Sequence, residues 1–143
     1  MTGPRPQLEL SREEALRLLG SVPVGRVVFT YRALPAIRPV GHIVEGERIV
    51  FRTSAAAAIT TAVDGAGTVV AFEADAIDPV SRSGWSVVVV GGAHLLRDTA
   101  EVDRYQQLLQ PWAAGDKNDV IAIGADVVTG FRLHGSQDAP SLP

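Results

Sequence analysis

Short apolar segments separated by turn-forming residues restrict this chain to few folds. Each segment is rich in Val, Ile and Ala, and Gly, Pro, Asp or Asn lies near its ends. This pattern is typical of strands in an antiparallel β domain. We expect six strands, at 24–31, 37–44, 48–52, 68–74, 85–96 and 119–133. With short hairpin connections, they predict a mainly β fold whose sheet is a closed or nearly closed barrel.

Turn-forming residues also predict where the strands bend or end. Residues 33–35 interrupt the first two strands, and residues 45–46 form a two-residue turn before the third. Gly91-Gly92 lies inside an otherwise long strand, which indicates a bulge or a tight barrel corner. The last strand is expected to break near Gly124.

Three small helices are expected beside the barrel, at 8–20, 55–63 and 98–109. Ser11 and Glu14 have the spacing of a capping box, in which Ser11 is the N-cap and Glu14 reaches back to its amide. Asp98 and Glu101 repeat that spacing, and Pro111 ends the third helix. We expect one domain over 1–143, with a frayed tail at 135–143.

Composition excludes several classes of protein. Cysteine is absent, so a disulfide framework, a thiolate nucleophile and a Cys-ligated zinc are excluded, and a cytoplasmic location is expected. The net charge is −3, which gives no support to nucleic-acid binding. The longest apolar run, residues 87–90, is far too short for a membrane span, so no membrane partner is expected.

The end of the third strand carries the sharpest local signal for a ligand. Arg52, Thr53 and Ser54 stand directly before the alanine-rich helix. Free amides at a helix start, two hydroxyls and a guanidinium together form an anion seat suited to a phosphate. The alternative is that Ser54 merely caps the helix and that Arg52 is a solvated residue at a strand end.

The chain resembles the pyridoxamine 5′-phosphate oxidase-like, flavin-binding split-barrel proteins over roughly residues 18–133. The motifs that carry the resemblance occur in the family's order and read GRVVFT, LPAIRPVGHIVEGERIVFRTS, VVAFEADAID, GWSVVVVGGA, PWAAG and VVTGFRL. The resemblance implies a six-stranded antiparallel Greek-key split barrel and a homodimer. It also implies flavin mononucleotide (FMN), or alternatively a deazaflavin coenzyme, held between the subunits.

The resemblance assigns cofactor-binding roles to three groups of residues. The backbone of Arg38, Pro39 and Val40 would lie along the edge of the flavin ring, although an ordinary hairpin strand would have the same sequence. Arg52, Thr53 and Ser54 match the phosphate-binding strand end. Trp85, Trp112 and Arg132 match segments near the cofactor and the dimer interface, and their alternative roles are core packing, dimer packing and an exposed charge.

One departure from the family's pattern concerns the phosphate. The family usually continues with a glycine and then a lysine, where this chain has Ala56 and Ala58. Without that lysine, Arg52 and the helix end alone hold the phosphate, or a different cofactor binds, or flavin binding is lost. The last possibility is the reason for a second hypothesis, a non-enzymatic ligand-binding or structural dimer.

Other candidate chemistry is weak. The histidines His42, His94 and His134 are widely spaced and predict no metal site. His42 is either a proton donor at the cofactor cleft or an interior histidine, and Glu73 with Asp75 is read as a solvated or interface pair. No catalytic residue is assigned. The leading prediction is a flavin- or deazaflavin-dependent oxidoreductase that transfers hydride to or from a small-molecule substrate.

Overall fold

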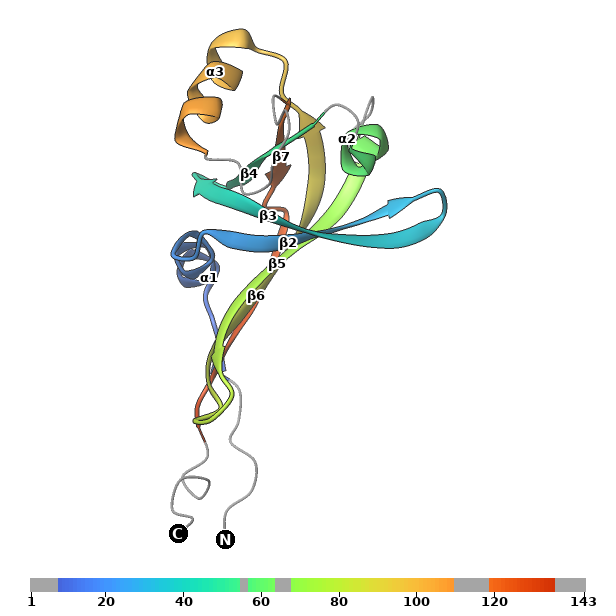
Figure 1. Ribbon diagram of the computed structural model, residues 1–143. Helices are drawn as coiled ribbons and strands as arrows, with labels where there is room; N and C mark the ends of the chain where they lie inside the picture. The colour runs from blue at the N-terminus through green and yellow to red at the C-terminus, as the bar shows by residue number, and fades with distance from the viewer. Residues whose placement is uncertain (1–7, 55–56, 64–67, 110–118, 136–143) are drawn as a thin grey trace, which may run out of the picture.

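The computed structural model describes residues 8–54, 57–63, 68–109 and 119–135 (Figure 1). The described residues form eight strands and three helices. In chain order these are β1 (Leu8–Glu9), α1 (Arg12–Gly20), β2 (Val24–Tyr31), β3 (Leu34–Glu45), β4 (Arg48–Thr53), α2 (Ala58–Val63), β5 (Thr68–Asp78), β6 (Ser83–Leu95), α3 (Thr99–Leu108), β7 (Asp119–Gly124) and β8 (Val127–Leu133). No helix among them is long and apolar enough to span a membrane.

Six of the strands close into an antiparallel barrel, as the sequence predicted. The strands pair in the order β6-β5-β2-β3-β4-β7, and a further pairing of β7 with β6 completes the ring. Since β5 follows β4 along the chain but lies between β2 and β6, the connection crosses over in Greek-key fashion. Beyond the barrel, β5, β6 and β8 continue as an arm with α1 beside it, and the β2–β3 hairpin projects sideways (Figure 1).

Gly91-Gly92 is the corner at which β6 changes partner. Up to Val90, β6 pairs with β8, and from Ala93 onward it pairs with β7. A Cβ atom on Gly91 would overlap the backbone carbonyl of Gly124, so only glycine permits this approach. The sequence-based prediction of a tight corner is confirmed.

The core explains why the strand at 48–53 is apolar on both faces. Ile49 and Phe51 point into the barrel, where they join a core with fully buried Phe72. Val50 points the other way and packs in a smaller cluster with Tyr105 of α3. Helix α3 therefore covers the outside of β4.

Two turns lie one or two residues away from their predicted places. The first hairpin turns at Arg32-Ala33, both with positive φ, and residues 34–35 belong to β3 rather than interrupting it. This is the geometry of a type I′ turn, which normally signals itself through Asn or Gly. In the second hairpin the turn is Gly46-Glu47, because Glu45 still pairs with Arg48.

The two predicted N-caps are present, but the Glu14 carboxylate, expected to reach back to the Ser11 amide, accepts from Arg132 instead. Ser11 accepts a bond from the Glu14 amide at 3.2 Å, so α1 begins at Arg12, and Leu8–Glu9 form a short strand on β8 instead of helix. Asp98 caps α3 as predicted. The final strand breaks after Gly124, as expected. Of the expected tail, only Gly135 lies within the described residues.

Candidate functional site

The end of β4 places Arg52 and Thr53 on opposite faces of the strand. Thr53 points inward and is 5% exposed, whereas Arg52 points outward to α3. The Arg52 guanidinium donates to the carbonyl oxygens of Gln106 at 3.0 Å and of Leu109 at 2.9 Å. Carbonyls at a helix C-terminus carry partial negative charge, so Arg52 is well placed to bind this helix end. Arg52 is therefore not a solvated strand end.

Ser54 begins the passage from β4 to α2. Its carbonyl oxygen accepts bonds from the Ala57 amide at 3.0 Å and from the Thr60 hydroxyl at 2.7 Å. Ala58, at the position of the family's lysine, packs against the main core. Ala56 lies outside the described residues, so the phosphate cradle predicted here remains a prediction.

A charged network that the motif search missed fixes α3 to the β3–β4 hairpin. The buried Tyr105 donates from its hydroxyl to Glu45 at 2.6 Å and accepts from Arg48 at 2.7 Å. Arg104 binds both oxygens of Glu45, at 2.8 and 2.6 Å, and Arg48 also reaches Glu101 at 3.1 Å. The bonds from Arg104 and Tyr105 lower the pKa of Glu45 to about 2. The alternation Arg48-x-Val50-x-Arg52 is the sequence signal for this face.

The β2–β3 hairpin carries the segment expected to face the flavin ring. Within the described chain, β4 pairs with β3 only from His42 onward, so residues 34–41 have one edge without a strand neighbour. The His42 amide donates toward β2, to the Pro23 carbonyl at 3.0 Å. Because amides alternate in direction along a strand, the backbone groups of Ile37, Pro39 and Gly41 face the free edge.

The free edge presents mixed backbone donors and acceptors from Ile37, Pro39 and Gly41. Ile37 and Gly41 offer amides, whereas Pro39 offers only its carbonyl because proline has no N–H. Arg38 and Val40 direct their backbone groups to β2 instead. The exposed Arg38 guanidinium lies 6.0 Å from the Phe29 ring centroid and donates to the Ile37 carbonyl at 2.9 Å.

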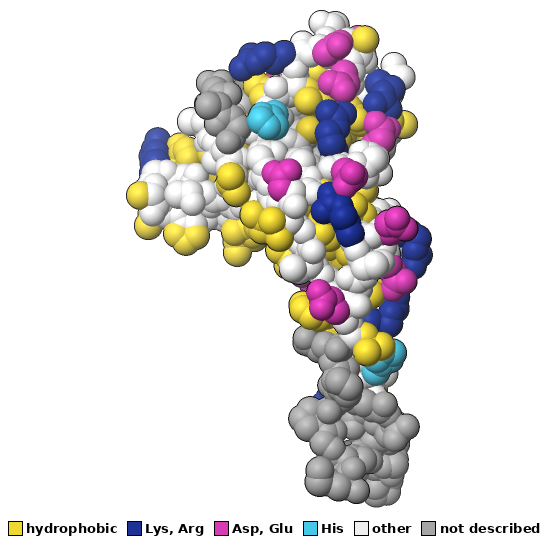
Figure 2. Space-filling view, turned by 180° about the vertical axis from the view of Figure 1, so that it is seen from behind, with side chains coloured by type: hydrophobic (Ala, Val, Ile, Leu, Met, Phe, Trp, Pro, Cys, Tyr) yellow, Lys and Arg dark blue, Asp and Glu magenta, His cyan; other side chains and the backbone are white. Residues whose placement is uncertain are grey.

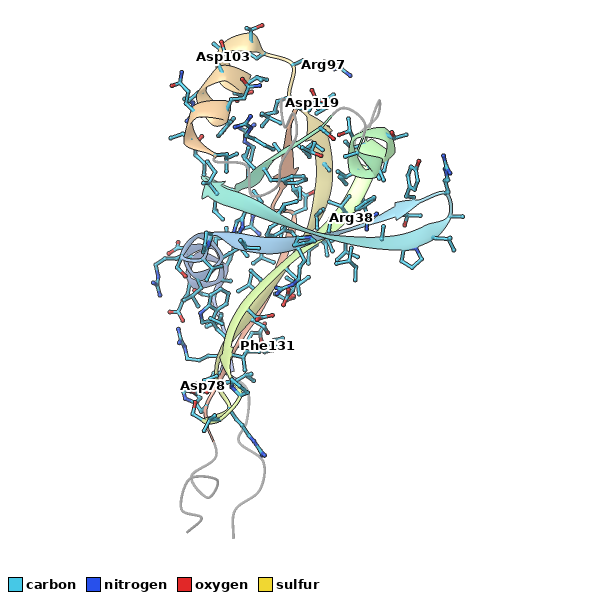
Figure 3. All side chains as sticks on the ribbon, viewed as in Figure 1. Arg38, Asp78, Arg97, Asp103, Asp119 and Phe131 are labelled. Atoms are coloured by element: carbon cyan, nitrogen blue, oxygen red, sulfur yellow. The ribbon has the colours of Figure 1, made fainter. Side chains whose placement is uncertain are left out.

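Trp85 and Arg132 come together, but away from the other predicted residues. They are direct partners on β6 and β8 in the arm. Trp85 is 7% exposed and belongs to the core, and Arg132 pairs with Glu14 of α1 at 3.0 Å. Figure 3 shows Phe131, the neighbour of Arg132, in the arm, far from Asp119 at the opposite end of the barrel. Trp112 lies outside the described residues.

His42 is an interior histidine. It is 4% exposed, its Nε2 lies 2.8 Å from the Leu19 carbonyl of α1, and its ring meets Phe72 edge-on at 4.8 Å. Since a carbonyl can only accept, Nε2 carries the proton. Its buried Nδ1 has no hydrogen-bond partner among the described residues. Burial lowers the pKa of His42, so its neutral form is favoured.

A second charged cluster lies on the outer face of β2 and β5. Arg26 is 3.1 Å from Glu73 and 3.9 Å from Asp75. Partial burial and the neighbouring Asp75 raise the pKa of Glu73 to about 6, against the opposing effect of Arg26. Among the described residues, no group of three or more His, Asp or Glu side chains is arranged to hold a metal ion.

Comparison with known proteins supplies the family. The family model described as pyridoxamine 5′-phosphate oxidase matches residues 11–134. An uncharacterized protein of Mycobacterium tuberculosis is 50% identical over 139 residues, which is 95% of this chain and 91% of that protein.

Two solved structures extend the comparison to the fold. A candidate pyridoxamine 5′-phosphate oxidase of Corynebacterium glutamicum is 32% identical, covers 90% of this chain and 99% of its own, and has a TM-score of 0.76. An FAD-binding protein of Mycobacterium smegmatis is 29% identical, with coverage of 90% and 100% and a TM-score of 0.69. This chain thus belongs to the pyridoxamine 5′-phosphate oxidase family of split-barrel proteins.

Proposed function

We propose that this protein is a homodimeric, flavin-dependent oxidoreductase with its cofactor in the seam between the subunits. The observation that carries the proposal is the free edge of β3, where the backbone groups of Ile37, Pro39 and Gly41 can bind the polar edge of a flavin ring. Family membership and a relative that binds FAD, at 29% identity, support the same class of cofactor.

The residues of this chain would hold the two ends of the cofactor differently. The β3 edge would orient the ring through backbone hydrogen bonds, and Arg38 would add positive charge beside it. The strand end at Ser54 would receive the phosphate, and Arg52 would add positive charge from the outer face of β4. The bound flavin would supply hydride transfer to or from a small-molecule substrate. FMN is the first candidate, and a deazaflavin is the alternative.

The test is a binding titration with a backbone variant. Ile37→Pro removes the Ile37 amide from the free edge, where proline is tolerated because no strand pairs there. Ile37→Val is the matched control, since it changes the exposed side chain and keeps the amide. Loss of one hydrogen bond of about 1 kcal/mol should weaken FMN binding about fivefold in the proline variant alone.

Equal FMN affinity in Ile37→Pro and in the wild type would contradict the role of this edge. Purified protein that is colourless and binds none of FMN, FAD or a deazaflavin would favour the second candidate, a non-enzymatic dimer. The observation behind that candidate is Ala58, which packs on the core where the family has a phosphate-binding lysine.

A further inference from the structure

The outer face of the sheet carries an apolar row that crosses five strands. Consecutive partners along it are Ile37 on β3, Val28 on β2, Ala71 on β5, Val90 on β6 and Val127 on β8. Ile37 is 58% exposed and Val127 is 56% exposed. Figure 2 shows hydrophobic side chains gathered along the projecting hairpin. An apolar sheet face of this kind is normally covered by another part of the protein or by a partner, because exposing apolar area to water is unfavourable.

The neighbouring row contains the cluster of opposite charges. Its partners are Pro39, Arg26, Glu73, Val88 and Thr129, and Asp75 follows Glu73 by two residues on the same face of β5. Among the described residues, Arg26 is the cation within 4 Å of the two carboxylates. Across β6, Glu73 meets Val88, which has no charge. The Arg26–Glu73–Asp75 cluster beside the apolar row therefore carries one excess negative charge.

The size and charge of this face suit a second copy of the chain. The shortest of the five strands, β8, has 7 residues, so five strands spaced about 4.8 Å apart cover roughly 550 Å², the same order as the 800 Å² that a standard interface buries per partner. The face also carries both signs of charge. A twofold-related copy can therefore place its Arg26 near the Glu73 and Asp75 of the first, which makes the two faces partly complementary in charge.

When a second copy covers this face, the charges of the two Arg26–Glu73–Asp75 clusters do not balance. Two copies contribute four carboxylates and two guanidinium groups, so two negative charges enter the contact without partners. Burying a charge without a partner is costly, and a carboxylate in that position takes up a proton instead. Glu73 is already poised for this step, because partial burial and Asp75 raise its pKa to about 6 before any second copy arrives.

We propose that two copies associate through this outer sheet face and that association takes up protons at the Glu73–Asp75 pair. The inference rests on the homodimer of the proposed function and adds a regulation to it. The groups that face Glu73 are Arg26 from β2 and Asp75 from β5, while β6 contributes only Val88. The dimer is tighter in mild acid and loosens as the pair ionises.

Sedimentation of the full chain measures the linkage directly. Each proton taken up changes the association constant by up to about tenfold per pH unit. From about pH 8 to about pH 5.5, spanning the titration of a carboxyl with a pKa near 6, we expect the dimer dissociation constant to fall at least about tenfold. Glu73→Gln keeps the size of the side chain and removes its charge, so this variant should dimerise tightly at both pH values.

Glu13→Gln is the matched control, because Glu13 is an exposed carboxylate on α1, away from this face. It should show the wild-type pH dependence. Calorimetric dilution in two buffers of different ionisation heat should register proton release on dissociation in the wild type and in Glu13→Gln, and much less in Glu73→Gln.

The outcomes separate the two proposals. A chain that stays monomeric at every pH contradicts the dimer of the proposed function and this inference with it. A dimer with the same dissociation constant at both pH values contradicts the proton linkage alone. A Glu73→Gln variant that keeps the full pH dependence would move the linkage to another group and overturn the assignment to this pair.

Discussion

His42 links α1 to the barrel through one hydrogen bond, from its Nε2 to the Leu19 carbonyl. Nε2 is the donor, and the buried Nδ1 has no hydrogen-bond partner in the described part of the chain, so a proton placed there would find no acceptor. Protonation would therefore place both a charge and an unsatisfied N–H in the core, and both are unfavourable there. His42 therefore stabilises the fold in its neutral form, and its contribution to the free energy of unfolding depends on pH.

We predict that the contribution of His42 to the free energy of unfolding decreases in acid. The folded-state pKa of His42 lies below its ordinary value of 6.5, so the unfolded chain binds the proton more readily. The stability from neutral His42 is complete above pH 6.5 and is lost as the pH falls from there toward the lowered pKa. His42→Gln keeps a donor for Leu19 and removes the titration.

Chemical denaturation at a series of pH values measures this effect. The free energy of unfolding of the wild type, minus that of His42→Gln, should fall as the pH drops below 6.5. The subtraction matters because Glu73 acts in the opposite direction: its pKa is raised to about 6, so its protonation favours the folded state. A difference that stays constant with pH would show that His42 does not titrate between the two states.

Among the elements, α3 is the one whose position depends most on charged groups. Glu45, Arg48 and Arg104 hold its middle, while Arg52 holds the carbonyls of its last turn. The two arginines of β4 reach the helix because both lie on the face of Val50. Arg52 thus has a structural role at the same strand end where the family resemblance places a phosphate.

Comparing FMN with riboflavin separates the two roles of Arg52, phosphate binding and the positioning of α3. Arg52→Ala should lower the free energy of unfolding by about 1–3 kcal/mol, because two helix carbonyls lose a charged donor. In flavin titrations the variant should weaken FMN binding while leaving riboflavin, which lacks the phosphate, nearly unchanged. Arg52→Lys keeps the charge without the guanidinium fork, so it should recover part of the FMN affinity.

An equal loss of FMN and riboflavin affinity in Arg52→Ala would show that Arg52 acts only through the position of α3. An unchanged free energy of unfolding would contradict the contacts with the Gln106 and Leu109 carbonyls. The two readouts are independent, since one is measured without any ligand.

For the whole molecule, local patterns predicted the strands and the barrel but not the partners of individual side chains. Hydrophobic patterning and the Gly91-Gly92 pair depend on neighbouring residues, so they can be read from the sequence. The turn at Arg32-Ala33 could not be read, because neither residue is typical of positive φ and the strands around it fix that geometry.

The candidate site was less predictable for the same reason. The partners of Arg52 lie 54 and 57 residues further along the chain, and only the folded barrel brings them together. The segment that the resemblance assigned to the flavin ring has a free edge, but the direction of each of its amides depends on the register with β2. Glu45 and Tyr105 carried no motif, so their network was missed.

Closure of the barrel depends on one backbone approach, which gives a prediction for the whole fold. At Gly91, an added Cβ would overlap the Gly124 carbonyl oxygen, and both backbones are held by strand pairing, Gly91 with Val70 and Gly124 with Arg48. Gly91→Ala should therefore force β6 and β7 apart, at a cost of about 3 kcal/mol or more in the free energy of unfolding.

The adjacent glycine is the control for this change. A Cβ on Gly92 would meet only the tip of the His94 side chain at 3.4 Å, which is free to move. Gly92→Ala should thus change the free energy of unfolding by less than about 1 kcal/mol, although both variants lose the same conformational freedom in the unfolded chain. Similar unfolding midpoints for the two variants in urea would mean that the β6 corner does not need the close contact with Gly124, and that the barrel closes through its side chains instead.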